Sequence, residues 1–100
     1  MFIVLLRYAD NKHLAGQFRQ EHVQWIKQGI DDGVFLMAGG LPPERGGSVF
    51  AHGLTLEALE ARLEADPYIA EGVVQPEIIE FSPALAEPRL QFLLNPVTQH

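Results

Sequence analysis

The chain has 100 residues, the size of a single domain, and 47% of them are hydrophobic, which suffices for one small core. It contains no cysteine, and this excludes disulfides, thiolate catalysis and cysteine-ligated zinc sites. The 13 acidic and 7 basic residues give a formal charge of −6, with the arginines dispersed, so we expect no nucleic-acid partner.

The start of the chain does not resemble a secretion signal. Met1–Leu6 is apolar but too short for the core of a signal peptide, and no basic segment precedes it. No apolar run approaches the roughly 18 residues of a membrane span. Together with the absence of cysteine, these features predict a cytoplasmic protein that does not bind membranes.

The first half of the chain predicts a strand, a long helix and two further strands. Phe2–Tyr8 is apolar on both faces, as expected for a strand that is covered on both sides. A helix is expected at His13–Asp31, where apolar residues recur at helical spacing. Val34–Ala38 is a second apolar run of strand length, and Ser48–His52 is a third strand. The segment between them, Gly39–Gly47, is rich in turn residues and is expected to be a loop.

The second half predicts a helix, a short helical turn and a fourth strand. Thr55 is a suitable N-cap for the helix. Its apolar edge is formed by Leu56, Leu59 and Leu63. Asp66, followed by a proline, is expected to cap a short turn that ends near Gly72. Val73–Phe81 is the fourth strand, and it belongs at a sheet edge because Pro76 cannot donate to a strand ladder.

This order of elements, β-α-β-β-α-β, is that of the α+β ferredoxin-like fold, or split βαβ, with an antiparallel four-stranded sheet. Its two helices can cover only one face of the sheet, whereas the first two strands are apolar on both faces. A second copy of the same sheet is the simplest cover for the other face, so we predict a homodimer packed sheet to sheet. The alternative is that the C-terminal tail covers that face.

We expect one domain at residues 1–81 and a tail at residues 82–100. The tail contains Pro83, Pro88 and Pro96, which prevent a long helix. Between them, Leu90–Leu94 is an apolar run of strand length that would be prone to aggregate if left in water. We therefore expect the tail to dock on its own domain or on a neighbouring subunit, and a role in assembly is one hypothesis for this protein.

His22 is the residue that most directly indicates chemistry. Helical spacing places it among the apolar residues of the first helix, so its imidazole, a group that can titrate near neutral pH, points toward the core or a cleft. It is either a core histidine with satisfied ring nitrogens or a general acid or base that needs a carboxylate partner. Asp66 is the leading partner, because both helices of this fold lie on the same sheet face. Asp66 could also serve as an N-cap, which is compatible with this pairing because a carboxylate has two oxygens, and an ion pair with Arg62 is a third explanation.

The segments around these residues resemble the YciI-like (YCII-related) proteins, a small bacterial family in the dimeric α+β barrel group. The resemblance covers residues 1–81. It is carried by the opening strand, the helix segment with its histidine, the second strand and the Asp-Pro step: Phe2–Leu6, Arg19–Val23, Val34–Gly39 and Ala65–Tyr68 with Gly72. The resemblance implies that two copies of the domain form a dimeric α+β barrel.

For function, the resemblance implies acid–base chemistry. His22 and Asp66 match the family's His–Asp pair, which is regarded as an acid–base dyad in a pocket between helix and sheet. One member eliminates chloride from a chlorinated hydroxyquinol, and muconolactone isomerase shares the broader fold. We therefore hypothesise a small homodimeric enzyme of lyase or isomerase type that acts on a small organic acid or phenolic compound without a cofactor. The alternative is a small-molecule binding module on the same scaffold, with no turnover.

Four further residues are candidates for substrate contacts. Arg7 and Tyr8 end the first strand, where they could bind an anionic or phenolic oxygen. Gly39 and Gly40 stand where many relatives have Gly-Pro, and they begin a loop that could act as a lid. We expect no metal site, because no histidines have metal-ligand spacing on one helix; a site that joins His52 to the helix histidine is the alternative.

Overall fold

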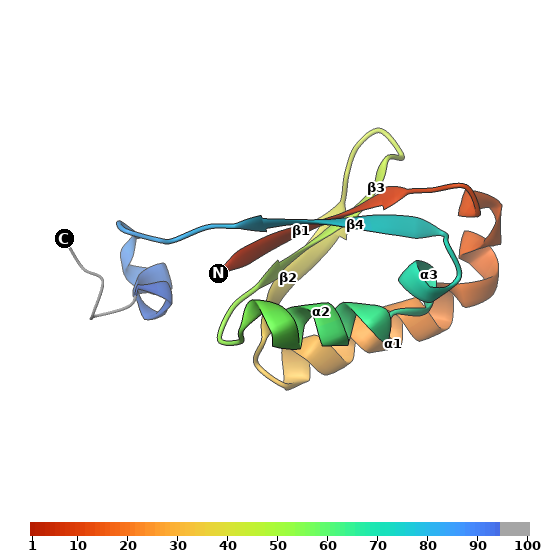
Figure 1. Cartoon of the computed structure of the whole chain (residues 1–100). Coiled ribbons are helices and arrows are strands. Elements are labelled where there is room, and N and C mark those ends of the chain that lie inside the picture. The colour runs from red at the N-terminus through yellow and green to blue at the C-terminus, as the bar shows by residue number, and fades with distance from the viewer. Residues whose placement is uncertain (95–100) are drawn as a thin grey trace.

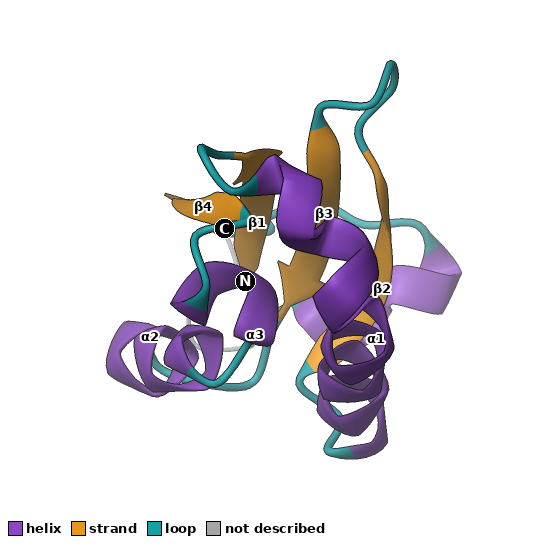
Figure 2. Cartoon of the chain, turned by 90° about the vertical axis from the view of Figure 1, so that its right-hand side faces the viewer, coloured by secondary structure: helices purple, strands orange, loops and turns teal. Residues whose placement is uncertain are grey.

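The chain folds, as predicted, into an α+β domain of the ferredoxin-like class. The computed structural model describes residues 1–94. The elements in chain order are β1 (Phe2–Tyr8), η1 (Lys12–Leu14), α1 (Ala15–Asp31), β2 (Phe35–Gly40), β3 (Gly46–Ala51), α2 (Leu56–Glu64), α3 (Pro67–Ala70), β4 (Val74–Glu80) and η2 (Pro88–Leu93). The strands form one antiparallel sheet in the order β2-β3-β1-β4, and α1, α2 and α3 all lie on one side of it (Figures 1 and 2).

The core lies between the sheet and these helices. Phe2, Val4 and Leu6 of β1 are buried on the helix side, while Ile3 and Leu5 alternate onto the opposite face and are half-buried. The most buried helix residues in the core are Trp25, Leu59, Leu63 and Tyr68. The helices α1, α2 and α3 therefore cover one face of the sheet, and we call the opposite face, on which none of these three lies, the open face.

The connection between β2 and β3 is shorter than the sequence predicts. A loop is expected at Gly39–Gly47, but strand pairing continues through Gly40 and resumes at Gly46, so the loop comprises residues 41–45. The glycines allow the backbones to approach closely: a Cβ on Gly47 would lie 3.1 Å from the carbonyl oxygen of Gly39. The prediction was wrong because these glycines serve close strand pairing as well as turning.

Three local signals in the sequence are confirmed. β4 lies at the edge of the sheet, as Pro76 indicates. Thr55 caps α2, because its Oγ1 accepts a hydrogen bond from the N–H of Ala58 at 3.1 Å. Asp66 caps α3 in the same way. The first α-helix begins at Ala15 and not at the predicted His13, because residues 12–14 take the tighter 3₁₀ form that is common at helix starts.

The tail extends past the end of the sheet, where η2 turns back (Figure 1). The apolar run predicted at strand length is thus a 3₁₀ helix, begun by Pro88, whose fixed φ suits a first helical position. The ring of Phe92 lies 5.6 Å from that of His52, so η2 contacts its own domain. Ile79 on β4 is still 41% exposed, so the tail does not cover the whole open face. Residues 95–100, with the predicted helix breaker Pro96, lie outside the described residues.

Within residues 1–94, no helix combines the length and the apolar character needed to cross a bilayer.

Candidate active site

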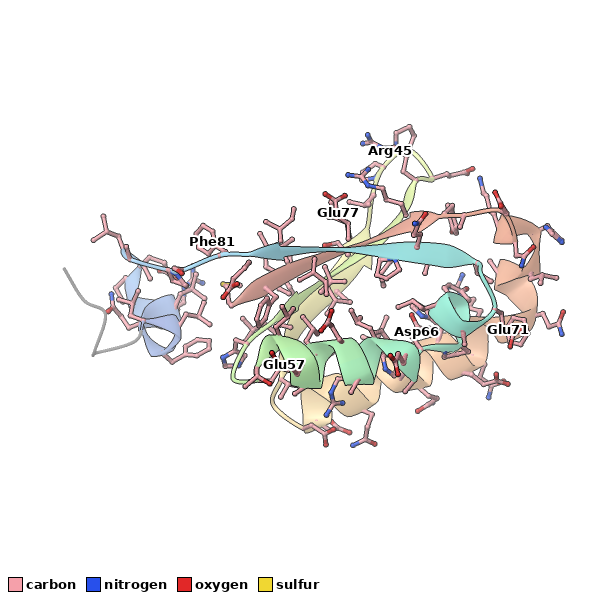
Figure 3. The ribbon with its side chains drawn as sticks, viewed as in Figure 1. Arg45, Glu57, Asp66, Glu71, Glu77 and Phe81 are labelled. Carbon is pink, nitrogen blue, oxygen red and sulfur yellow. The ribbon has the colours of Figure 1, made fainter. Side chains whose placement is uncertain are left out.

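Asp66 is placed by the short connection between α2 and α3. Its Oδ1 accepts a hydrogen bond from the N–H of Tyr68 at 3.0 Å and so caps α3, in which Pro67 occupies a first-turn position. The side chain is fully buried, with 0% of its surface exposed. It lies beneath the sheet, among the helices (Figure 3). A capping requirement thus brings a carboxylate into the interior of the domain.

The same oxygen of Asp66 also binds His22. Oδ1 of Asp66 lies 2.8 Å from Nδ1 of His22, whose side chain is 13% exposed. Because an ionised carboxylate only accepts hydrogen bonds, Nδ1 is the donor, and in the neutral ring the lone pair is then on Nε2. The structure therefore brings together the two side chains that the sequence nominates, one from α1 and one from the start of α3.

The second carboxylate oxygen, Oδ2 of Asp66, is buried and has no hydrogen-bond partner among the described residues. The ion pair considered between Asp66 and Arg62 is not formed, because Nη2 of Arg62 lies 3.0 Å from Oδ2 of Asp32. Thus the described groups that stabilise the Asp66 charge are the imidazole of His22 and one backbone N–H. A buried charge with so few partners depends strongly on each of them.

Aromatic rings hold the imidazole of His22 in place. The ring of Tyr68 is stacked on it at 3.9 Å between centroids, with 6° between planes, and Trp25 lies 6.0 Å away. Both neighbours are anchored by hydrogen bonds: Tyr68 Oη donates to the carbonyl oxygen of Ala15, and Trp25 Nε1 donates to that of Arg62. The orientation of the imidazole is therefore fixed by stacking as well as by the bond to the carboxylate.

His22 opens onto a cavity of about 360 Å³ between α1 and the sheet. One wall is a stripe of α1 with residues at helical spacing, namely Arg19, His22, Val23 and Ile26. The opposite wall is the β2–β3 hairpin, where four glycines present backbone without side chains: Gly39, Gly40, Gly46 and Gly47. Tyr8 and Tyr68 complete the polar lining with the hydroxyl-bearing Ser48. The size is that of a site for a small molecule.

The predicted substrate contacts divide into two groups. Tyr8, Gly39 and Gly40 line the cavity with His22. Arg7 does not, because side chains of a strand alternate and Arg7 shares the open face with Leu5. There its Nε lies 3.3 Å from Oε1 of Glu77, which also points away from the helices (Figure 3).

The cavity residues that sequence analysis did not name as site residues include Arg19 and Tyr68. Arg19 precedes His22 by three positions on the same helix, a spacing that places both side chains on one face. Tyr68 follows the capping Asp66 by two positions, so the cap itself directs it toward the histidine. Both spacings are visible in the sequence.

The side chains that could ligate a metal do not converge in this region. Among residues 1–94, no three His, Asp or Glu side chains form a group that could hold a metal ion. His52, considered as a second ligand with His22, does not line the cavity and lies against Phe92 of the tail.

Replacing Tyr68 with phenylalanine is expected to reduce the loss of stability at alkaline pH. Burial raises the pKa of Tyr68 above its usual 10.0, and the nearby Tyr8 adds to the rise. The folded protein then holds the phenol proton more tightly than the unfolded chain, so this contribution is complete below the unfolded pKa and is lost as the pH rises through the folded one. In urea denaturation between about pH 8 and 11, the unfolding free energy of the wild type should fall more steeply than that of Tyr68→Phe. Equal slopes would contradict this.

Comparison with known proteins places the chain in a family. A solved structure with the same fold is 5-chloro-2-hydroxyhydroquinone dehydrochlorinase from Burkholderia phenoliruptrix AC1100, in complex with 2,5-dihydroxybenzoquinone. The two superpose over 82% of this chain and 94% of that chain, with a TM-score of 0.66 and 10% sequence identity, so the likeness shows the fold. A comparison with curated proteins gives no match. The family model of the YCII-related domain matches residues 1–82, and the chain therefore belongs to the YCII-related family, as its sequence segments predict.

Proposed function

We propose that this protein is a small acid–base enzyme in which His22 moves a proton on a substrate held in the cavity. The observation that carries the proposal is the 2.8 Å hydrogen bond between Nδ1 of His22 and the fully buried carboxylate of Asp66. Such a carboxylate fixes the tautomer and stabilises the imidazolium that forms when the other ring nitrogen takes up a proton. His22 lines the cavity, where Nε2 serves as the base.

The proton transfer can lead to either of two reactions, an isomerisation or an elimination. Nε2 of His22 removes a proton from the substrate, and the electron pair of the broken bond moves into an adjacent carbonyl group or ring to give an enolate or phenolate. In an isomerisation, the imidazolium returns the proton to another carbon. In an elimination, the electron pair expels a leaving group as an anion. Asp66 stays ionised in both and keeps the ring oriented.

A small organic acid or phenolic compound is the substrate class that we propose. The cavity of about 360 Å³ has apolar surfaces from Leu6, Val23 and Ile26 beside its polar groups, which suits a small planar ring. The dehydrochlorinase that shares the fold acts on a chlorinated hydroxyhydroquinone and was solved with a benzoquinone bound. Both observations support this class of substrate.

We also propose a cytoplasmic location, which the absence of cysteine supports.

We further propose that the protein acts as a homodimer joined through the open face. The strand register sets four apolar residues side by side across all four strands: Ile79 of β4, Ile3 of β1, Phe50 of β3 and Met37 of β2. Ile79 is 41% exposed and Met37 57% exposed. A continuous apolar row of this kind is typical of a surface that packs against another protein surface, and a second copy supplies the same row.

The proposed chemistry is tested by ¹H NMR in D₂O with a panel of small oxo acids and dihydroxy-aromatic compounds. The panel includes 5-chloro-2-hydroxyhydroquinone, for which chloride release is also measured. We expect the wild type to catalyse hydrogen exchange or elimination on at least one compound. His22→Gln should lower that rate by about 10²–10⁴-fold, the usual contribution of a general acid or base.

The matched control is His13→Gln, which makes the same change at an exposed histidine outside the cavity and should leave the rate unchanged. A wild type that binds members of the panel without converting any of them would favour the binding-module alternative over an enzyme. Full activity of His22→Gln would rule out the proposed role of the imidazole.

A further inference from the structure

Arg19 is a cation in the cavity wall for which the described structure shows no carboxylate partner. Three of the seven basic residues of the chain have such partners, namely Arg7, Arg62 and Arg89. Arg19 forms no ion pair within residues 1–94, and no Asp or Glu side chain lines the cavity. In a chain with a net charge of −6, the lining of this opening thus contains one arginine and no carboxylate among the described residues.

The position of Arg19 relative to His22 is set by the helix. Three residues along an α-helix correspond to a rise of about 4.5 Å, and both residues line the same cavity. The same cavity is lined by Tyr8, whose ring has Nζ of Lys12 4.9 Å from its centroid. Burial raises the pKa of Tyr68, and the Arg19 guanidinium opposes that rise, as expected of a cation near the phenol. Arg19 thus stands close to the ring that stacks on His22.

We propose that Arg19 selects anionic substrates by binding a carboxylate or phenolate oxygen while the neighbouring carbon or oxygen faces His22. The guanidinium presents several N–H donors in a plane, which matches two oxygens of a carboxylate, and no group of the described protein neutralises it. The glycines of the β2–β3 hairpin carry no side chains, which leaves room for a flat ring between the hairpin and the α1 residues Arg19 and His22. The catalytic consequence rests on the proposed function, whereas the preference for an anion does not.

A pair of probes that differ only in charge isolates this preference. Benzoate and benzamide have the same shape, but only benzoate is an anion near neutral pH. Binding is measured by titration of the wild type at low salt, following the NMR resonances of His22 and Val23. We expect benzoate to bind at least about tenfold more tightly than benzamide, the difference that one charge-assisted contact provides. Added salt should weaken benzoate binding more than benzamide binding.

Substitutions in α1 test whether the preference for benzoate depends on Arg19. Arg19→Gln should abolish the difference between the two probes and leave benzamide binding unchanged, while Arg19→Lys should retain part of it. Lys27→Gln is the control, since Lys27 is an exposed cation on the same helix outside the cavity, and the preference should persist in full.

The preference can be overturned independently of the proposed reaction. Equal binding of the two probes to the wild type, no response of His22 to millimolar benzoate, or a preference that survives in Arg19→Gln would each refute it. The readout is binding and needs no turnover. If the wild type discriminates but converts nothing, the proposed enzyme fails and the anion selectivity of Arg19 stands.

Discussion

Replacing Asp66 with alanine is expected to lower the free energy of unfolding by about 3–5 kcal/mol. The substitution removes the cap of α3 and also leaves Nδ1 of His22 without a partner in a site that is largely closed to water. Removing one member of a buried pair costs more than the pair contributes, because the remaining polar group stays desolvated. Urea denaturation at neutral pH and one protein concentration measures the change.

Thr55→Ala is the matched control for this prediction. Thr55 caps α2 with a side-chain oxygen 3.1 Å from a backbone nitrogen, as Asp66 caps α3, but Thr55 is exposed and has no contact with the cavity. Losing an ordinary cap costs about 1 kcal/mol. If Asp66→Ala were no more destabilising than Thr55→Ala, Asp66 would act as a cap alone, and the pair with His22 would contribute little to the fold.

Asp66→Asn removes the negative charge of the side chain and keeps its shape. The amide oxygen can accept both hydrogen bonds that Oδ1 accepts now, so the fold is retained. Its NH₂ group then occupies the site of the unpartnered Oδ2, at a cost of about 1–3 kcal/mol. The variant no longer stabilises an imidazolium, so any rate found with the wild type should fall by about 10²–10⁴-fold, as in His22→Gln.

Much of the site can be predicted from the sequence, because the signals for it come from residues close together along the chain. Helical spacing put His22 on the inward stripe of α1, and the Asp-Pro step placed Asp66 at a helix start. The edge position of β4 followed from one proline. Each of these depends on the nearest residues along the chain, where the backbone geometry of helices, caps and strands leaves few alternatives.

The wrong predictions concern features that depend on the alternation of side chains along a strand or on pairing with a distant strand. Arg7 and Tyr8 are adjacent in the sequence, but neighbouring strand residues face opposite sides and of the two only Tyr8 lines the cavity. The glycines at 39 and 40 predict the start of a loop, whereas both lie within β2 and Gly40 pairs with Gly47 in the sheet. Such pairing depends on contacts with another strand, which composition does not report. The division into a domain at 1–81 and a tail at 82–100 stays a prediction.

Ile79→Asp is expected to convert the proposed homodimer into monomers. Ile79 ends the apolar row that crosses the sheet to Met37, and in a two-fold interface each substitution is present twice. Burying two carboxylates without partners should raise the dissociation constant of the dimer by at least about a thousandfold. Light scattering over a range of concentrations measures the mass, and circular dichroism checks that the domain is still folded.

The control for the open face is Ile30→Asp, which introduces the same charge at another exposed isoleucine. Ile30 is 45% exposed on α1, the side of the sheet opposite to Ile79, and Ile79 is 41% exposed, so the two sites differ mainly in the face they occupy. Only the change on the open face should alter the mass, because that face carries an apolar row which the described tail covers only in part, with Ile79 still 41% exposed. A monomeric wild type, or equal masses for the two variants, would show that the row is not an interface between copies. In either case η2 and the segment before it, whose Leu85 is 93% exposed, would be the remaining apolar surface to examine for a partner.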